Sequence, residues 1–255
     1  MSSLNGGNPA NPTDDADRRI IKSPTENADR RIIKNPTENV DRPIIGNPTE
    51  NVDRQIILAS GSPRRIDLLQ RFVPSLKVVR SDIEEVASGP PQGQVRALAE
   101  RKARDVGRRQ HGLIVAADTM VAVDGKMLGK PDGRADARKM LRRLSGRGHT
   151  VWTGLCVLDS ESNRLEEAVE STTVWFRRVT EEEIEVYLAL GEYHDKAGAY
   201  AIQGAAAVFV ERIEGDYYNV IGLPLCRLDQ LLERFGRGLL SEHAGTGRGT
   251  QSVRT

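Results

Sequence analysis

Apolar residues are arranged in two different ways along the chain, and the arrangement changes near residue 55. Before this point, isolated Ile pairs and Pro-containing turns stand among charged side chains, which leaves little apolar surface to bury. Beyond it, short apolar runs alternate with stretches in which apolar residues recur at helical spacing. The second pattern is typical of strands alternating with amphipathic helices, whereas the first does not offset the entropy of ordering a chain.

The N-terminal region consists of tandem copies of one twelve-residue sequence. The copies read ADRRIIKSPTEN over residues 16–27, ADRRIIKNPTEN over 28–39 and VDRPIIGNPTEN over 40–51. A period of twelve matches none of the longer solenoid repeats, and neither a charge run nor an aromatic anchor marks a partner-binding segment. We expect three regions: a disordered leader over residues 1–52, a folded domain over 53–236 and a disordered Gly/Ser/Thr-rich tail over 237–255.

The folded region has the sequence pattern of an α/β domain. Helices are predicted over residues 63–72, 93–109, 136–144, 180–190 and 224–235, and the fourth begins with a Thr-x-x-Glu capping box. Strands are predicted over residues 56–59, 76–79, 113–117, 150–158, 168–179 and 206–213, and an Asp-Gly turn predicts a hairpin over 121–128. Fully apolar runs are typical of buried strands and a hairpin is antiparallel, so we expect a mixed central sheet with flanking helices.

Composition and charge restrict the possible partners. The chain has 37 Lys and Arg residues against 36 Asp and Glu residues, so no overall field attracts a nucleic acid polymer, although a local cluster can still bind a small polyanion. The sequence shows neither an apolar run as long as a membrane span nor a signal-peptide pattern, and we expect a cytoplasmic protein without a membrane partner. Cys156 and Cys226 are expected to be reduced residues in or near the core.

The segment LASGSPRR, residues 58–65, has the features of a phosphate-binding turn. It joins a strand to a helix through small residues, so backbone N–H groups and the positive helix end can meet an anion. Arg64 and Arg65 add two guanidinium groups, and Ser62 suits the N-cap position. The segment is neither a Walker loop nor a Gly-x-Ser-x-Gly elbow. An ordinary capped helix with surface arginines remains the alternative at this point.

Two places in the sequence offer carboxylates for a hard cation. Asp118 follows the apolar run 113–117 and is expected at a strand end, and Glu84-Glu85 follows the short strand 76–79. Two carboxylates together with substrate phosphates can hold Mg²⁺ or Mn²⁺, while a solvated acidic turn is the alternative for Glu84-Glu85. The four histidines, which lack metal-ligand spacing and disfavour zinc, are expected at surface or loop positions: His111, His149, His194 and His243.

Several motifs occur in one order between residues 56 and 235. They are LASGSPRR, Asp82-Ile-Glu-Glu85, the helix segment with Lys102, Ala-Asp118-Thr119, Leu-Gly-Lys130-Pro, Lys196-Ala-Gly-Ala-Tyr-Ala-Ile-Gln203-Gly and Val-Ile-Gly-Leu-Pro-Leu225. In this order they resemble the Maf family of nucleoside triphosphate pyrophosphatases. The resemblance implies a Maf/HAM1-like fold with two lobes around a nucleotide cleft, and hydrolysis of a triphosphate to the monophosphate and pyrophosphate. It also implies a possible homodimer, and says nothing about the repeats or the tail.

The resemblance further implies roles for individual residues. Catalytic roles fall to Glu85, Lys102, Asp118 and Lys130, and substrate contacts to Ser60, Ser62, Arg64, Arg65, Thr119, Lys196 and Gln203. Glu85 and Asp118 are the implied ligands of a divalent metal, and Asp118 is implied to be the general base or chiefly a metal ligand. These roles suit phosphoryl transfer, which depends on positioning and on neutralising oxygen charge.

The motif at residues 197–204 favours one branch of the family. Ala-Gly-Ala-Tyr-Ala-Ile-Gln-Gly resembles the branch that acts on dTTP and UTP, whereas the 7-methyl-GTP branch differs at the Tyr and Gln positions. An amide such as that of Gln203 offers a donor and an acceptor to the edge of uracil or thymine, although it can equally cap backbone groups. A pyrophosphatase for 7-methyl-GTP or another modified nucleotide, and a non-catalytic regulator of septum formation, remain alternatives. Removal of non-standard pyrimidine nucleotides from the pool is a further implication.

Overall fold

A computed structural model of the chain describes residues 54–245, and the expected disordered leader lies outside the described residues. Its strands are β1 Ile56–Leu58, β2 Lys77–Val78, β3 Leu113–Val123, β4 Lys126–Leu128, β5 Gly148–Asp159, β6 Leu165–Phe176 and β7 Val210–Glu214. Its α-helices are α1 Pro63–Gln70, α2 Pro91–Gly107, α3 Arg134–Leu144, α4 Glu181–Ala189, α5 Tyr217–Ile221, α6 Leu225–Glu233 and α7 Leu239–Gly245. Two short 3₁₀ helices are η1 Ala197–Ala199 and η2 Ala205–Phe209.

The strands form one seven-stranded mixed sheet, which confirms the expected α/β fold class. The order is β2-β1-β3-β5-β6-β7, and β4 pairs with β3 outside this path. β1 lies parallel to both β2 and β3, whereas β3, β5, β6 and β7 follow one another in antiparallel pairs. The parallel β1–β3 pair joins two buried apolar runs, whereas β2 is an exposed strand of two residues at the edge of the sheet.

One edge of β3 has two neighbours with a gap between them. Pairing with β1 ends at Val115, and pairing with β4 begins at Val121. The other edge of β3 pairs with β5 without interruption from Leu113 to Ala122. Asp118 therefore lies in mid-strand, and its expected place at a strand end is wrong. The strand continues because β5 supports it, while the gap on the β1 side gives Asp118 the access that a strand end would have given.

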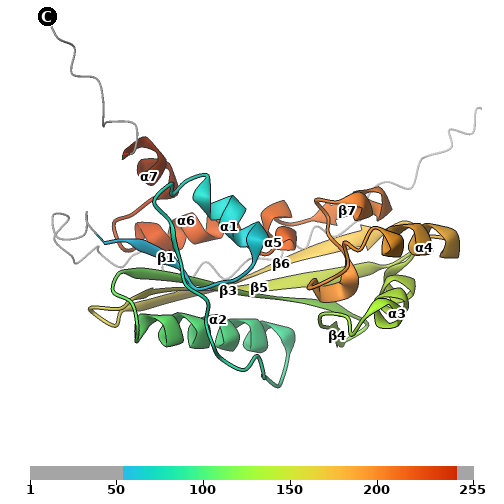
Figure 1. Ribbon diagram of the computed structural model, residues 1–255, viewed down its shortest axis with the longest axis horizontal. Helices are drawn as coiled ribbons and strands as arrows, with labels where there is room; N and C mark the ends of the chain where they lie inside the picture. Colours follow the sequence, from blue (N-terminus) through green and yellow to red (C-terminus); the bar gives the residue numbers. More distant parts are fainter. Residues whose placement is uncertain (1–53, 246–255) are drawn as a thin grey trace, which may run out of the picture. The chain divides into compact units, whose positions relative to one another are not determined.

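The strict alternation of side chains along β3 separates two apolar cores. Ile114 and Ala116 belong to the smaller core under α2, whereas Val115 and Ala117 belong to the larger core on the opposite face. Figure 1 shows α2 on one side of β3 and β5, and α1, α5 and α6 on the other. By the same alternation, Asp118 faces α2 and the next residue faces the side of α1.

Helix α2 packs directly on the sheet because β5 has a glycine beneath it. A Cβ atom on Gly154 would lie only 2.3 Å from the carbonyl oxygen of Val95, so no larger residue fits without moving the helix. The buried residues of α2 recur at helical spacing and include Leu98, Lys102 and Val106. The spacing places the Lys102 side chain on the face that meets β3, close to Asp118.

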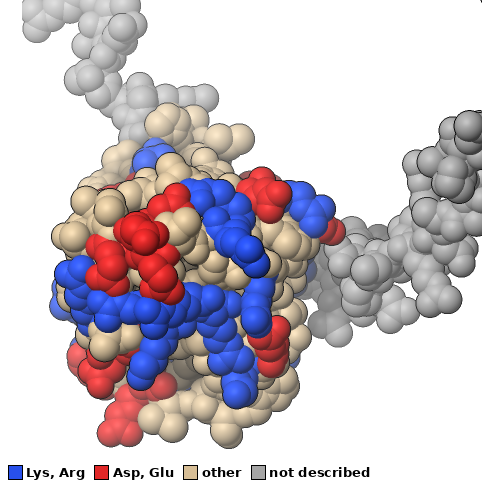
Figure 2. All heavy atoms as spheres, turned by 90° about the vertical axis from the view of Figure 1, so that its right-hand side faces the viewer, with Lys and Arg blue, Asp and Glu red and all other residues tan. Residues whose placement is uncertain are grey.

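A ladder of ion pairs joins α3 to α4 at the other end of the sheet. Figure 2 shows the Lys and Arg side chains of this face interleaved with Asp and Glu side chains. Arg134 and Arg138, one turn apart on α3, both pair with Glu185, and Arg142 pairs with Glu181. Each exposed pair contributes little to stability, but together they neutralise the arginines of α3 locally. The capping box is also confirmed, since Thr180 caps the first turn of α4.

Three other expectations do not match the structure, and one helix was not expected. The strand expected over residues 206–213 is replaced in its first half by η2 and continues as β7. The short helix α5 was not predicted at all. Both cysteines are free as expected, but Cys226 is exposed while Cys156 is buried. His149 is buried and not at the surface, because it lies on the same inward face of β5 as Val151 and Thr153.

The C-terminal segment returns to the beginning of the folded region, so the expected disordered tail is wrong for residues 239–245. Helix α7 buries Leu239 in the larger core, and the backbone N–H of Leu239 donates to Asp229 at 2.6 Å. The Arg237 guanidinium pairs with Glu242 and donates to the carbonyl oxygen of Arg54 at 2.6 Å. The Gly/Ser/Thr-rich composition concealed this helix. None of the helices in the described part of the chain is long and apolar enough to cross a membrane.

We predict that Leu239→Ala destabilises the protein. The side chain is only 3% exposed, and its truncation should lower the free energy of unfolding by about 2–5 kcal/mol because a cavity remains. The adjacent Leu240 is 72% exposed, so Leu240→Ala is a matched control that should change stability by less than about 0.5 kcal/mol. Urea unfolding measures both, and equal effects would show that α7 is not docked.

Candidate active site

A pocket of about 770 Å³ opens at the gap in the edge of β3. Its walls come from the β1–α1 turn, the loop before α2, the middle of β3, the segment after β4, residues 195–203 and the end of α5. Every residue expected at the site lines it: Ser60, Ser62, Arg64, Arg65, Glu85, Lys102, Asp118, Thr119, Lys130, Lys196 and Gln203. The fold thus brings together side chains that are up to 143 positions apart, from Ser60 to Gln203.

A buried lysine joins two carboxylates on the α2 side of the pocket. The Lys102 Nζ atom lies 2.6 Å from Asp118 Oδ1 and 2.6 Å from Glu85 Oε1, and Lys130 Nζ lies 3.8 Å from Glu85 Oε2. Lys102 is only 8% exposed, and a buried ammonium group requires such partners. The contacts fix the loop before α2 against the middle of β3.

The two carboxyl groups are shifted in opposite directions. Burial raises the pKa of Asp118, and the charge and hydrogen bond of Lys102 only partly oppose this rise. For Glu85, burial also acts to raise the pKa, but the hydrogen bond and charge of Lys102 and the charge of Lys130 outweigh it and lower the pKa. Neighbouring acids with separated pKa values are suited to different roles, one as a proton acceptor and the other as a fixed charge.

Arg65 is held in the pocket by uncharged groups alone. Its Nε donates to the carbonyl oxygen of Gly222 at 2.8 Å, and its other nitrogens donate to Thr119 Oγ1 at 2.9 Å and to Ser60 Oγ at 3.4 Å. Among the described residues, it forms no ion pair with a carboxylate. Burial lowers the pKa of Arg65, and the nearby Asp118 opposes this effect. The guanidinium charge is therefore available to an anionic ligand.

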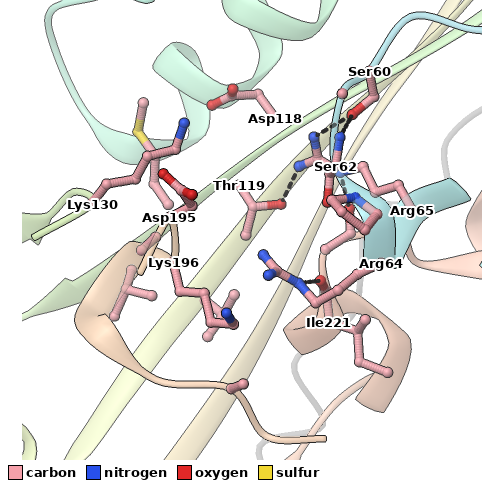
Figure 3. Close-up of a pocket in the computed structure, with 18 of the residues that line it drawn as sticks. Ser60, Ser62, Arg64, Arg65, Asp118, Thr119, Lys130, Asp195, Lys196 and Ile221 are labelled. Atoms are coloured by element: carbon pink, nitrogen blue, oxygen red, sulfur yellow. Dashed lines mark hydrogen bonds between the residues drawn. The ribbon is translucent and has the colours of Figure 1, made fainter. Parts of the chain in front are cut away.

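The β1–α1 turn places both arginines at the pocket, which disfavours the alternative of a capped helix with surface arginines. Arg64 Nε donates to the carbonyl oxygen of Ile221 at 3.4 Å, and Figure 3 shows its guanidinium group opposite Lys196. Ser62 occupies the N-cap position, but its side chain makes no capping bond, and its N–H donates to Ser60 Oγ at 3.2 Å. The turn is thus organised by Ser60.

Two further charged residues line the pocket that sequence reasoning did not identify. Asp195 lines the pocket between Lys130 and Lys196 and has a positive φ of 57°, while Arg80 lines the pocket from the loop that follows β2. Burial and the charge of Arg64 lower the pKa of Lys196. In total the pocket is lined by six Lys or Arg side chains and three carboxylates, and this positive excess suits a polyphosphate.

The residues present fit a metal bound jointly with phosphate. Within residues 54–245, no group of three or more His, Cys, Asp or Glu side chains is arranged to hold a metal ion. Glu85 and Asp118 nevertheless supply two carboxylates on either side of Lys102. Mg²⁺ is commonly bound through one or two carboxylates plus substrate phosphates and water, so a donor set of this size is sufficient once a triphosphate is present.

Comparison with known proteins agrees with this geometry. The family described as "Maf-like protein" matches the chain over residues 55–235. The chain belongs to the Maf family. The matched residues include the whole wall of the pocket, so the Maf resemblance inferred from sequence motifs is confirmed.

The alignments of this chain with Maf relatives cover most of each relative's length. A dTTP/UTP pyrophosphatase of Dictyoglomus thermophilum is 46% identical over 189 residues, which cover 72% of this chain and 98% of the relative. Another of the same name, from Alkaliphilus metalliredigens, is 48% identical over 183 residues, covering 70% of this chain and 95% of the relative. The Ham1 protein of Staphylococcus aureus is a distant structural match, with 14% identity and a TM-score of 0.38 over 48% of this chain and 72% of its own.

Behind the pocket of this Maf protein lies a buried pair, His149 and Tyr200. His149 Nε2 and the Tyr200 hydroxyl are 2.8 Å apart, and both rings pack edge-on against Phe176. His149 Nδ1 has no hydrogen-bond partner, and burial lowers the pKa of His149 to about 4. Tyr200 itself lines the pocket, so the neutral His149 ring supports the segment that carries Gln203.

We predict that His149 makes stability depend on pH. Its pKa is about 4 in the folded protein against 6.5 for the free side chain, so the unfolded chain binds more protons between these values. Stability from this group is complete above pH 6.5 and falls as the pH drops through about 4, with a loss of about 2 kcal/mol at pH 5.

The variant His149→Gln keeps a donor near Tyr200 and cannot titrate. Between pH 7 and pH 5 it should therefore lose less free energy of unfolding than the wild type, by the same margin of about 2 kcal/mol. His111 is exposed, so His111→Gln is the control and should behave as the wild type. Identical pH dependence in His149→Gln and the wild type would contradict the assignment.

Proposed function

We propose that this protein hydrolyses dTTP and UTP at the bond between the α and β phosphates, releasing the nucleoside monophosphate and pyrophosphate. The observation that supports this most strongly is a single pocket in which a carboxyl group of raised pKa lies beside six cationic side chains. The names of the relatives, dTTP/UTP pyrophosphatase at 45–48% identity for three of them, support the same substrates.

Asp118 is the proposed general base. Its Oδ1 atom accepts a hydrogen bond from Lys102, so Oδ2 is the oxygen that remains for the attacking water. The raised pKa of Asp118 makes the carboxylate a better proton acceptor than an exposed one. Lys102 keeps the carboxylate in place and stabilises it until the proton is taken.

The cationic side chains bind the triphosphate and stabilise the leaving pyrophosphate. Arg64 and Arg65 approach from the β1–α1 turn, and Lys130 and Lys196 approach from the opposite wall. Charge that develops on the bridging oxygen is thereby met by fixed donors, which is the main source of catalysis in phosphoryl chemistry. A divalent cation held by Glu85, Asp118 and the phosphates, Mg²⁺ or Mn²⁺, would neutralise further oxygen charge.

Gln203 is the residue proposed to recognise the base. Its amide can donate to a carbonyl oxygen and accept from N3–H of uracil or thymine. The turn that carries it is held by Glu192, whose Oε2 accepts from the N–H of Ala205 at 2.9 Å. A Cβ atom on Gly204 would lie 2.0 Å from that same oxygen, so a larger residue would displace the Glu192 carboxylate from the turn. The homodimer and the cytoplasmic location stay predictions.

We predict that the purified full chain, with Mg²⁺ and either UTP or dTTP, releases pyrophosphate, and that Asp118→Asn slows turnover by about 10²–10⁴-fold because the base is lost. The control is Asp67→Asn, which alters an exposed carboxylate of α1 outside the pocket and should leave turnover unchanged. The enzyme assignment fails if neither nucleotide is cleaved and Asp118→Asn matches the wild type in every assay.

We also predict a preference for bases with an N3–H group. In a mixture of UTP, dTTP, CTP and 7-methyl-GTP, the first two should be consumed first. Gln203→Ala should lower kcat/KM for UTP by about tenfold, the value of one or two lost hydrogen bonds, and change hydrolysis of CTP less. Faster cleavage of 7-methyl-GTP would instead assign the protein to the other branch of substrates.

A further inference from the structure

Asn219 is a fully buried polar residue that no step of the proposed reaction uses. It lies in α5 and is 0% exposed. Its Nδ2 donates to the carbonyl oxygen of Val151 at 3.0 Å and to Thr172 Oγ1 at 2.9 Å, which ties α5 to β5 and β6. Its backbone carbonyl oxygen accepts from Thr153 Oγ1 at 3.3 Å. A helix of five residues is too short to hold its position alone, so α5 depends on these bonds.

The end of α5 holds both arginines of the phosphate turn. The carbonyl oxygens of Ile221 and Gly222 accept from Arg64 and Arg65, at 3.4 Å and 2.8 Å. Carbonyl groups at a helix C-terminus lack intrahelical partners and carry partial negative charge, so they are suited to bind cations. The position of these acceptors therefore follows that of α5, and the position of α5 follows that of Asn219.

A second path connects Asn219 to Arg65 through two threonines. Thr119 and Thr153 hydroxyls are 2.9 Å apart, and either could donate. The single hydroxyl proton of Thr153 is used on the carbonyl oxygen of Asn219, so Thr119 must donate to Thr153. Thr119 then offers only lone pairs on its other side, where Arg65 donates to it at 2.9 Å. The network fixes the direction of each bond and presents Thr119 to the pocket as an acceptor.

We propose that Asn219 is a positioning residue that sets the geometry of Arg65 and thereby strengthens binding of the triphosphate. Of the three acceptors of Arg65, Gly222 depends on Asn219 through α5 and Thr119 through Thr153, while Ser60 is independent. This inference rests on the proposed function for its meaning in catalysis. Phosphate binding alone, however, can test it.

The test is a double-mutant cycle with Arg65→Met. Asn219→Leu keeps the approximate side-chain volume and removes both donors. It should lower kcat/KM for UTP, and weaken binding of inorganic tripolyphosphate in calorimetry, by about tenfold in the wild-type background. In the Arg65→Met background the same substitution should cost less than about threefold, because the group through which it acts is gone.

Thr153 supplies variants that leave both side-chain hydrogen bonds of Asn219 intact. Thr153→Val removes the hydroxyl at nearly constant shape and should reproduce part of the loss in tripolyphosphate binding, whereas Thr153→Ser keeps the hydroxyl and should restore it. These variants keep the proposal testable if Asn219→Leu does not fold. Ser145→Ala is a matched control, since Ser145 bridges to Val179 by two hydrogen bonds, at 2.8 and 3.2 Å, far from the arginines in the network. It should lower stability without changing tripolyphosphate binding.

Two results would overturn the proposal. One is equal loss from Asn219→Leu with and without Arg65, which would mean that it acts only through general stability. The other is unchanged tripolyphosphate binding in both Asn219→Leu and Thr153→Val. A wild-type protein that cleaves neither UTP nor dTTP would refute the proposed function, whereas the binding cycle would still decide the role of Asn219.

Discussion

The ammonium group of Lys102, placed between Asp118 and Glu85, is the interaction on which the rest of the site depends. Each partner comes from a different part of the fold: α2, the middle of β3 and the loop between β2 and α2. Removing one carboxylate would leave a buried charge without full compensation, which is far more costly than losing an exposed ion pair. The contacts of Lys102 therefore hold the loop in place, and they also act against burial to lower the pKa of both carboxyl groups. The same contacts thus serve the fold and the site.

The geometry of β3 explains how such a compact site arises. Asp118 and Thr119 are adjacent, so they point to opposite faces of the sheet, one toward Lys102 and the other toward Arg65. They reach the same pocket only because the sheet is interrupted between β1 and β4 on that edge. Glu85, Lys102 and Asp118 thus meet on one face, Arg65 and Thr119 meet on the other, and the pocket opens at the edge between the two faces.

Sequence reasoning predicted the charged residues that line the pocket better than the buried residues that support them. Arg65 and Asp118 belong to motifs whose chemistry can be recognised from the sequence alone. Tyr200, His149 and Asn219 act through burial and through partners 47 to 68 positions away, and such pairing is set by strand register and not by local pattern. The place of Asp118 was wrong for the same reason, since an apolar run that ends in a polar residue looks like a strand end until the neighbouring strand is known to continue.

The attachment of the repeats has an evolutionary consequence. Arg54, the first described residue, pairs with Asp159 and receives a hydrogen bond from Arg237 at the amino end of β1, whereas the phosphate turn follows its carboxyl end. Gain or loss of whole repeats, a frequent product of replication slippage, changes what precedes Arg54 and leaves the described lining residues, between Ala59 and Gly222, unchanged in sequence. We therefore expect selection on the pocket to act on the residues that line it, between Ala59 and Gly222, and not on the number of repeats.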